Sequence, residues 1–321
     1  MPRILTTVPH DFRALTPERL AWWQERADVV DRRERSRLGL VRELRRRAKG
    51  CDALLLDGSV GTSELYSDLV VAAAARGPAV VISDASWKRG SWWGDRLAGR
   101  VAIRAVDSPR VTYCVLSSAE LDLFPRTWGV DPRRVVFTPF CVTLEEHEPV
   151  EDDGSVFAGG ESLRDYGPLL GAARGLPARV TIASGSIAGA TPENVVAGRV
   201  PHERFGALLR SCRVVVVPLA RGIERSAGQQ TYLNAMAAGK LVIVTDSPGA
   251  RDYVDDGVTG LVVPPGDATA LRRALEWCLD DGNAEEHDAM RRRAVEQARS
   301  RFSLDAYFER LLRAVERVLE P

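Results

Sequence analysis

The stretch "AGQQTYLNAMAAGKLVIVTD", residues 227–246, places a helix-forming run directly before an apolar strand. Its first residues, from Ala227 to Thr231, combine a glycine with two glutamines and a threonine. A helix start exposes unpaired backbone N–H groups and the positive end of the helix dipole, so it can bind an anion such as a phosphate. Glycine and threonine are also ordinary residues at helix starts. Taken alone, the stretch leaves both interpretations open.

Short apolar runs alternate with longer amphipathic ones on both sides of this stretch. In the first half, the strand-like runs are residues 3–8, 52–57, 79–83 and 113–117. In the second half, they are residues 155–160, 179–184, 213–219, 240–246 and 260–264. Repeated β-α units of this kind build parallel sheets, so the sequence predicts an α/β fold.

An acidic segment, "TLEEHEPVEDDGS" at residues 143–155, separates the two halves and is poor in large apolar side chains. A chain of 321 residues is long enough for two hydrophobic cores. We therefore expect an N-terminal domain over residues 1–148 and a C-terminal domain over 149–302. The last segment, 303–321, is expected to be a helix that packs back toward the N-terminal domain. Its apolar stripe consists of Leu304, Phe308, Leu311, Val315 and Val318.

The composition argues against several classes of protein. Basic and acidic residues balance at 44 each, so the net charge gives no reason to expect nucleic acid as a partner. The five cysteines are scattered without CxxC spacing, which indicates neither a disulfide framework nor a zinc site. The apolar run after Met1 is too short for a signal peptide, and no run is long enough to span a membrane. We expect a cytoplasmic protein that is soluble or peripheral to the membrane.

The residues from Tyr232 to Leu275, "YLNAMAAGKLVIVTDSPGARDYVDDGVTGLVVPPGDATALRRAL", closely resemble the C-terminal domain of GT-B glycosyltransferases, especially the GT4-like group (glycosyl transferases group 1). This ordered run of helix, glycine, strand, turns and helix is far more specific than an isolated glycine motif. Upstream, "VFAGGESLRDYGPLLGAA" at 156–173 resembles the first strand and phosphate loop of that domain. Similarly, "LLRSCRVVVVPLA" at 208–220 resembles the strand before its donor-binding helix. The resemblance implies a GT-B fold, in which two Rossmann-like domains face each other across a cleft.

The resemblance also implies where a nucleotide diphosphate sugar would bind. The helix start at residues 228–231 would receive the diphosphate, and Arg164 stands where the family has a basic contact to it. Family members commonly have two glutamates, one near the donor sugar and one on the ribose, at the positions that Ser226 and Asn234 occupy here. The donor-binding residues implied in this way are Gly160, Arg164, Glu224, Ser226, Ala227, Gly228, Gln229, Gln230, Thr231 and Asn234.

Alternatives remain at several of these positions. The Asn234 amide can hydrogen-bond a ribose hydroxyl, but without the charge of a carboxylate. Glu224 could replace the acid that is missing at Ser226. Arg164 could instead form an exposed ion pair with Asp165.

In the N-terminal half, polar side chains follow the predicted strands. Asp84 comes just after residues 79–83, at the carboxyl edge where open parallel sheets bind ligands, and could orient or accept the proton of an attacking hydroxyl. His10 is a second candidate base. An aspartate at a strand end also often caps a helix or forms a turn, and a histidine beside a proline is often a plain loop residue. The acceptor-binding residues predicted here are Asp11, Asp57, Ser59, Trp87 and Trp92.

The segment "WKRGSWW", residues 87–93, mixes tryptophans with basic side chains. Such a mixture could stack on sugar rings, cover a hydrophobic acceptor or lie at a membrane surface. The tryptophans could equally pack in a core beneath a loop.

We therefore expect a glycosyltransferase of natural-product or glycan biosynthesis that moves a sugar from a nucleotide diphosphate sugar to a hydroxyl acceptor. The resemblance implies that the reaction retains the anomeric configuration and needs no metal. The nucleotide sugar is a substrate, and no cofactor is expected. Two alternatives stay open: a sugar-nucleotide epimerase, and a non-catalytic nucleotide-sugar-binding partner subunit, which the missing glutamates favour.

Overall fold

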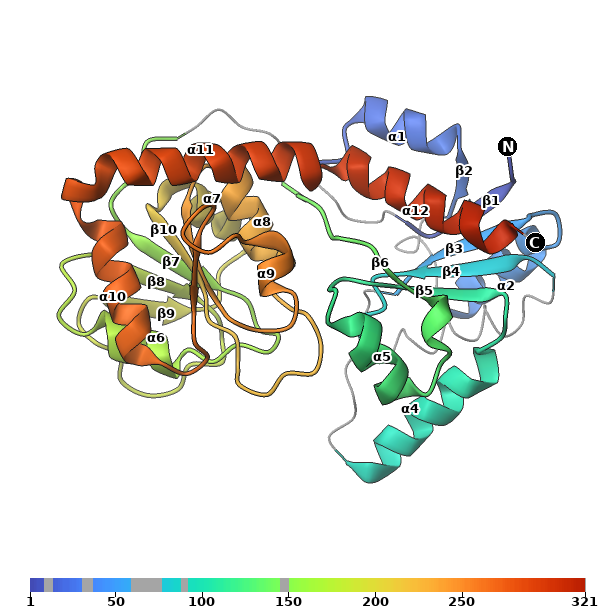
Figure 1. The fold of residues 1–321 in the computed structure, drawn as a ribbon, viewed down its shortest axis with the longest axis horizontal. Coiled ribbons are helices and arrows are strands. Elements are labelled where there is room, and N and C mark those ends of the chain that lie inside the picture. Colours follow the sequence, from blue (N-terminus) through green and yellow to red (C-terminus); the bar gives the residue numbers. More distant parts are fainter. Residues whose placement is uncertain (9–13, 31–36, 59–76, 88–91, 145–149, 321) are drawn as a thin grey trace. The chain divides into compact units, whose positions relative to one another are not determined.

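The computed structural model describes residues 1–8, 14–30, 37–58, 77–87, 92–144 and 150–320. The chain forms two compact units, one from Met1–Phe140 with Leu304–Pro321 and the other from Cys141–Ser303. Each unit contains a six-stranded sheet with helices packed against it (Figure 1). Every strand pairing in the described residues is parallel, which confirms the α/β class expected from the sequence.

The sheet of the first unit has the strand order β2-β1-β3-β4-β5-β6. Its strands are β1 Ile4–Thr6, β2 Ala27–Val29, β3 Ala53–Asp57, β4 Ala79–Ser83, β5 Val111–Val115 and β6 Val135–Phe137. The central strands β3, β4 and β5 are buried along their whole length, as expected of parallel strands covered on both faces. The strand order reverses between β1 and β3, and open α/β sheets bind ligands at such a point.

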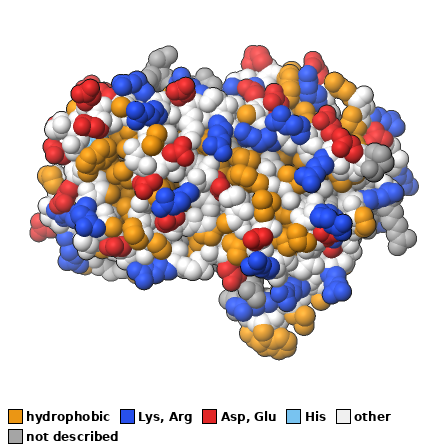
Figure 2. Space-filling model, in the orientation of Figure 1, with side chains coloured by type: hydrophobic (Ala, Val, Ile, Leu, Met, Phe, Trp, Pro, Cys, Tyr) orange, Lys and Arg blue, Asp and Glu red, His pale blue; other side chains and the backbone are white. Residues whose placement is uncertain are grey.

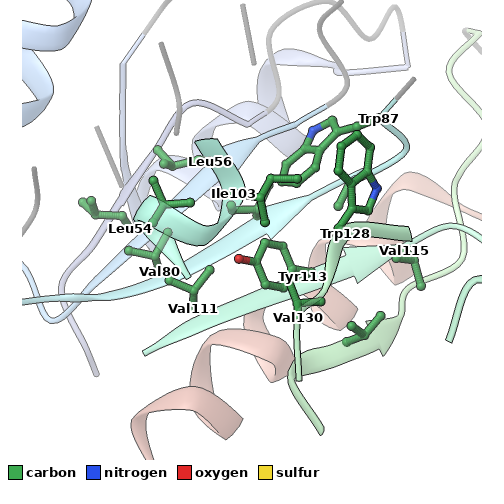
Figure 3. Packing of buried hydrophobic residues seen from close by; sticks show 14 of the residues in the cluster. Leu54, Leu56, Val80, Trp87, Ile103, Val111, Tyr113, Val115, Trp128 and Val130 are labelled. Atoms are coloured by element: carbon green, nitrogen blue, oxygen red, sulfur yellow. The ribbon is translucent and has the colours of Figure 1, made fainter. Parts of the chain in front are cut away.

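Helices cover both faces of this sheet. They are α1 Pro17–Gln24, α2 Arg37–Ala48, α4 Trp93–Val106, α5 Glu120–Trp128 and α12 Leu304–Leu319, with a 3₁₀ turn at Pro132–Arg134. On one face, side chains from α2, α4 and α5, such as Leu44, Ile103 and Trp128, join one hydrophobic cluster with the strands. Figure 3 shows Ile103 and Trp128 in this cluster beside Val80 and Tyr113.

The other face of the same sheet is covered by α12, which contacts β3, β4 and β5 (Figure 1). Its apolar stripe is buried at Leu304, Phe308, Leu311 and Val315. The Phe308 ring stacks on Trp23 of α1 with 4.3 Å between ring centroids. The segment from Leu304 onward therefore belongs to the first unit, although more than 160 residues separate it from Phe140 in sequence.

The sheet of the second unit has the order β12-β11-β10-β7-β8-β9. Its strands are β7 Val156–Gly159, β8 Val180–Ala183, β9 Val195–Gly198, β10 Val214–Val217, β11 Leu241–Thr245 and β12 Leu261–Val263. The helical segments are α6 Gly167–Ala173, α7 His202–Ser211, α8 Gln229–Ala237, α9 Ala250–Tyr253, α10 Ala268–Leu279, α11 Ala284–Arg301 and a 3₁₀ turn at Asp281–Asn283.

The strand order of the second sheet reverses between β7 and β10, which are hydrogen-bonded neighbours. The loop after β7 carries Arg164, and the segment after β10 leads into α8. The reversal therefore brings these two segments together at the carboxyl edge of the sheet, where a ligand is expected.

Candidate functional site

The loop after β7 is held in place by backbone pairing with the segment after β10. Arg164 and Leu219 form an antiparallel bridge. The Asp165 N–H donates to the Pro218 carbonyl at 3.0 Å, and the Ala220 N–H donates to the Leu163 carbonyl at 2.9 Å. Leu163 has a φ of 56°, a conformation that non-glycine residues rarely adopt. These contacts fix the backbone from which the Arg164 side chain extends.

The Arg164 guanidinium lies between two glycines of positive φ. A Cβ at Gly160 would lie 3.1 Å from Arg164 Nη2, and a Cβ at Gly228 would lie 3.6 Å from the same atom. The guanidinium donates to the carbonyls of Gly159 at 3.2 Å and Ser162 at 3.0 Å. Its Nη2 also lies 3.5 Å from Thr231 Oγ1 in α8. A side chain at Gly160 would thus crowd the guanidinium, and one at Gly228 would touch it.

The charge of Arg164 meets no carboxylate in the described part of the chain. Its three hydrogen-bond acceptors are two carbonyls and a hydroxyl. Within the described part of the chain, Arg164 does not form the alternative ion pair with Asp165. The Asp165 Oδ1 atom instead accepts from the Gly167 N–H at 3.0 Å. Burial lowers the pKa of Arg164, and the nearby charge of Arg225 lowers it further. A partly buried cation with a second cation close by is a favourable place for an anion.

The start of α8 adds donors to the same place. The helix begins after Gly228, which has a φ of 88°, and no side chain caps it. The first N–H groups of a helix have no partner within the helix. The Gln229 side chain is buried, and its Nε2 has no hydrogen-bond partner among the described residues. The helix start therefore offers N–H groups and the positive end of a dipole beside Arg164.

Arg225 is a residue of this site that the sequence reasoning missed. Its Nη2 donates to Ser162 Oγ at 2.9 Å, and its Nη1 donates to the Ser226 carbonyl at 3.4 Å. It thus links the loop after β7 to the segment before α8. The sequence did carry a signal for Arg225, because it stands directly before Ser226, which was predicted to bind the donor.

The remaining predicted donor residues lie in different environments. Ser226 and Ala227 are buried, whereas Glu224 is exposed. Gln230 is also exposed, and its Nε2 donates to Thr143 Oγ1 at 3.1 Å. The structure therefore brings Gly160, Arg164, Gly228 and Thr231 into direct proximity.

Asn234 binds the first residues of the second unit. Its Oδ1 accepts from the backbone N–H groups of Thr143 at 2.9 Å and Leu144 at 3.2 Å, and its Nδ2 donates to Thr143 Oγ1 at 3.0 Å. The side chain is buried, and both the oxygen and the nitrogen of its amide take part in these bonds. The ribose contact predicted for Asn234 stays a prediction, and it requires the amide to exchange these bonds for bonds to the nucleotide.

In the first unit, two aspartates lie at the carboxyl edge of the sheet. Asp57 ends β3 and Asp84 follows β4, and the register pairs Asp57 with Ser83. Both aspartates are buried. Asp84 has a φ of 48°, and its Oδ1 accepts from Ser86 Oγ at 2.6 Å. Strained backbone at a sheet edge is frequent in functional sites. The predicted residues His10, Asp11 and Ser59 lie outside the described residues.

Trp87 packs in the core of the first unit. It is 7% exposed and packs against Tyr113, Phe124 and Trp128, as Figure 3 shows for two of these rings. Its Nε1 donates to the Gly58 carbonyl at 3.2 Å. This burial favours the core interpretation of Trp87, and the acceptor contact predicted for its ring stays a prediction. Trp92, by contrast, is 58% exposed.

The described residues contain no group of three or more His, Cys, Asp or Glu side chains that could hold a metal ion. Among the same residues, no helix is long and apolar enough to cross a membrane.

The chain is similar in sequence to known glycosyltransferases over part of its length. Residues 188–301 match the family "Glycosyl transferases group 1". Over 157 residues the chain is 30% identical to alpha-D-kanosaminyltransferase of Streptomyces kanamyceticus. That match covers 49% of this chain and 35% of the relative, so the chain matches about a third of the relative's length.

Solved structures share the fold over nearly the whole chain. The Anabaena protein HepE in complex with UDP and glucose aligns with a TM-score of 0.69 at 15% identity, covering 99% of this chain and 100% of that one. Sucrose-phosphate synthase from Thermosynechococcus elongatus aligns with a TM-score of 0.66 at 13% identity, covering 99% of each chain. Together these findings confirm the resemblance to GT-B glycosyltransferases; placement in the GT4-like group stays a prediction.

Proposed function

We propose that this chain is a glycosyltransferase that moves a sugar from a nucleoside diphosphate sugar to a hydroxyl group of an acceptor. The observation that carries the proposal is the Arg164 guanidinium, which lies between Gly160 and Gly228 at the uncapped start of α8. A diphosphate placed there would accept hydrogen bonds from a guanidinium, a threonine hydroxyl and backbone N–H groups.

This arrangement supplies what the departing diphosphate needs. Cleavage of the bond between sugar and diphosphate places negative charge on the leaving phosphate oxygen. Fixed donors aimed at that oxygen stabilise the charge as it develops. Arg164 and the α8 start would serve this purpose in the second unit, with Arg225 close by. The proposed reaction therefore needs no divalent metal.

On the acceptor side, Asp84 is the proposed partner of the attacking hydroxyl. It is buried at the carboxyl end of β4, beside Asp57 at the end of β3. In the proposed retaining reaction, the diphosphate leaves on the face that the acceptor attacks, and its oxygen takes the acceptor proton. Asp84 would then orient the hydroxyl. Its carboxylate suits this role because the hydrogen bond from Ser86 Oγ and the unusual backbone conformation of Asp84 fix its position.

The test is a calorimetric comparison of nucleoside diphosphates with the matching nucleosides. UDP is the first ligand to try because the HepE structures contain it, and ADP, GDP and TDP complete the panel. Arg164→Ala should weaken diphosphate binding by at least about tenfold and leave nucleoside binding nearly unchanged, since a charge-assisted hydrogen bond is lost.

The matched control is Arg174→Ala, which removes an exposed arginine that follows α6 in the same unit. Diphosphate affinity should not change in that variant. Equal losses for diphosphate and nucleoside in Arg164→Ala would show that Arg164 acts only through the fold. Binding that disappears in a chelator would refute the metal-independent site.

A second candidate function is a non-catalytic nucleotide-sugar-binding subunit. The observation that favours it is the absence of a carboxylate at positions 226 and 234, where a buried serine and an amide bound to Thr143 stand instead. Tight diphosphate-sugar binding with neither transfer nor release of the diphosphate, across a panel of acceptors, would support this candidate over the enzyme.

A further inference from the structure

The outer face of α4 is apolar and has no partner among the described residues. Trp93, Leu97 and Val101 follow one another at every fourth position, so they form one stripe along the helix. Their exposed fractions are 68%, 56% and 59%, and that of Trp92, just before the helix, is 58%. Contiguous large apolar side chains at such exposure usually mark an interaction surface.

The opposite face of the same helix is already used. Ile103 and Val106 of α4 are buried in the core of the first unit. Figure 3 shows Ile103 pointing into that core. The stripe of Trp93, Leu97 and Val101 is therefore not a core face that a small rotation of the helix would bury.

Basic side chains run along one edge of the stripe. Arg96, Arg100 and Arg104 each lie three positions after a residue of the stripe, so each is its neighbour on the helix surface. All three are exposed. Arg100 donates to the carbonyls of Thr127 at 3.0 Å and Arg126 at 3.4 Å, which leaves its positive charge uncompensated by those contacts. Figure 2 shows hydrophobic side chains gathered where α4 begins, with Lys and Arg side chains beside them.

We propose that α4 docks on an anionic lipid surface, with the tryptophans and aliphatic side chains in the interfacial region and the arginines at the headgroups. Tryptophan prefers this depth because its ring is apolar and its N–H is polar. A helix that combines an apolar stripe with arginines is typical of proteins that lie in the plane of a membrane interface. This surface belongs to the first unit and does not depend on the proposed diphosphate site.

The test is co-sedimentation of the full chain with vesicles of phosphatidylcholine, with and without phosphatidylglycerol. The chain should bind the anionic vesicles at low salt, and added salt should weaken binding because it screens the arginines. Trp93→Ser combined with Leu97→Ser should reduce binding by about tenfold or more, since less apolar surface enters the interface. Arg100→Gln combined with Arg104→Gln should remove the preference for anionic lipid.

Matched controls come from the second unit. Val196→Ser removes an apolar side chain that is 61% exposed, and Arg174→Gln with Arg204→Gln removes two exposed charges elsewhere. Neither change should alter sedimentation, and all variants should keep the wild-type melting temperature and diphosphate affinity.

Three outcomes would overturn the proposal. The first is no sedimentation with anionic vesicles at low salt. The second is an equal loss of binding in the control variants. The third is a wild-type dimer, seen by light scattering, that the stripe variants convert to a monomer without any vesicle binding, because the stripe would then contact a second copy.

Discussion

The Asn234 side chain forms hydrogen bonds with both the backbone and the side chain of Thr143. Asn234 Oδ1 lies 2.9 Å from the Thr143 N, and Asn234 Nδ2 lies 3.0 Å from Thr143 Oγ1. The same Oδ1 accepts from the Leu144 N–H at 3.2 Å. The amide thus holds the first residues of the second unit against α8, at the position where the resemblance implies a glutamate.

The first prediction follows from this geometry. Asn234→Glu places a longer, charged group in a buried position and removes the donor to Thr143 Oγ1. We expect the free energy of unfolding to fall by roughly 1 to 3 kcal/mol, because a buried carboxylate must be desolvated and its neighbours displaced. Nucleoside diphosphate affinity should fall as well. Chemical denaturation and calorimetry measure the two effects.

The control for this variant is Thr269→Glu, which introduces the same charge on an exposed residue of α10 in the same unit, away from Thr143. It should change stability by less than about 0.5 kcal/mol, as surface substitutions usually do. A tighter-binding Asn234→Glu with unchanged stability would show that position 234 faces the ribose after all.

A second prediction concerns Gly228. Gly228→Ala adds a Cβ that would lie 2.8 Å from Val217 Cγ1 on a backbone with a φ of 88°. We expect a loss of roughly 2 to 3 kcal/mol in unfolding free energy, from backbone strain together with the clash. Because Gly228 opens α8, relief of the clash with Val217 should shift the helix start beside Arg164, and UDP affinity should fall in calorimetry.

Gly189→Ala separates these two causes. Gly189 has a φ of 92°, close to that of Gly228, but no atom lies within 4 Å of a Cβ built there. Its substitution should cost only the strain, about 1 to 2 kcal/mol, and leave UDP affinity unchanged. If both variants lose the same stability and neither loses affinity, then Gly228 does not shape the anion site.

A third prediction concerns an acid-sensitive contact in the second unit. Asp152 accepts from Arg213 Nε and Arg291 Nη2, both at 3.0 Å. Burial raises the pKa of Asp152, but the hydrogen bond from Arg213 and the charges of both arginines outweigh it, so the pKa lies below 3.8. A lowered folded-state pKa stabilises the protein above the unfolded value, and this stability is lost as the pH falls through the folded value.

Asp152→Asn should therefore lower the melting temperature at neutral pH, corresponding to about 1 to 3 kcal/mol, because it removes the carboxylate that Arg213 and Arg291 share. Among the described residues, Arg213 then keeps only its ion pair with Asp281, and Arg291 only its pair with Asp288. The gap to wild type should close as the pH falls below about 4. Asp246→Asn is the control, because Asp246 pairs with Arg251 on the exposed surface and such pairs contribute little. A gap that stays constant down to acidic pH would contradict the assigned role of the carboxylate.

The sequence predicted the central strands of both sheets but not all of the edge strands. Continuous apolar runs such as residues 52–57 and 213–219 are needed where both faces of a strand are covered, and β3 and β10 lie there. The missed strands β2, β6 and β9 lie at sheet edges. Val196 of β9 is 61% exposed, so no continuous apolar run marks that strand.

The sequence predicted the domain boundary more closely than it predicted the contacts around the site. Composition placed the crossing at residues 143–155, whereas the second compact unit begins at Cys141. The hydrogen bonds from Thr143 to Asn234 connect residues that are far apart in sequence, and composition does not report such contacts. Likewise, Trp87 and Trp92 look alike in sequence, but only the first turns inward to Tyr113 and Phe124.

The last prediction tests the acceptor side of the proposed reaction. Asp84→Asn keeps the shape of the side chain, and asparagine tolerates a positive φ such as the 48° found here. The fold should therefore persist, with an unchanged melting temperature and unchanged diphosphate affinity. If Asp84 orients the attacking hydroxyl, the acceptor-dependent release of UDP from a UDP-sugar should slow by roughly 10²-fold or more.

Two further variants locate the effect at the carboxylate. Ser86→Ala removes only the hydrogen bond to Asp84 Oδ1 and should slow turnover slightly. Asp57→Asn alters the neighbouring strand end and should raise the KM for the acceptor more than it lowers kcat, since Asp57 is proposed to bind the acceptor. An Asp84→Asn variant that turns over at the wild-type rate would remove Asp84 from the mechanism and leave the departing diphosphate and His10, the second candidate base, as the groups proposed to act on the acceptor hydroxyl.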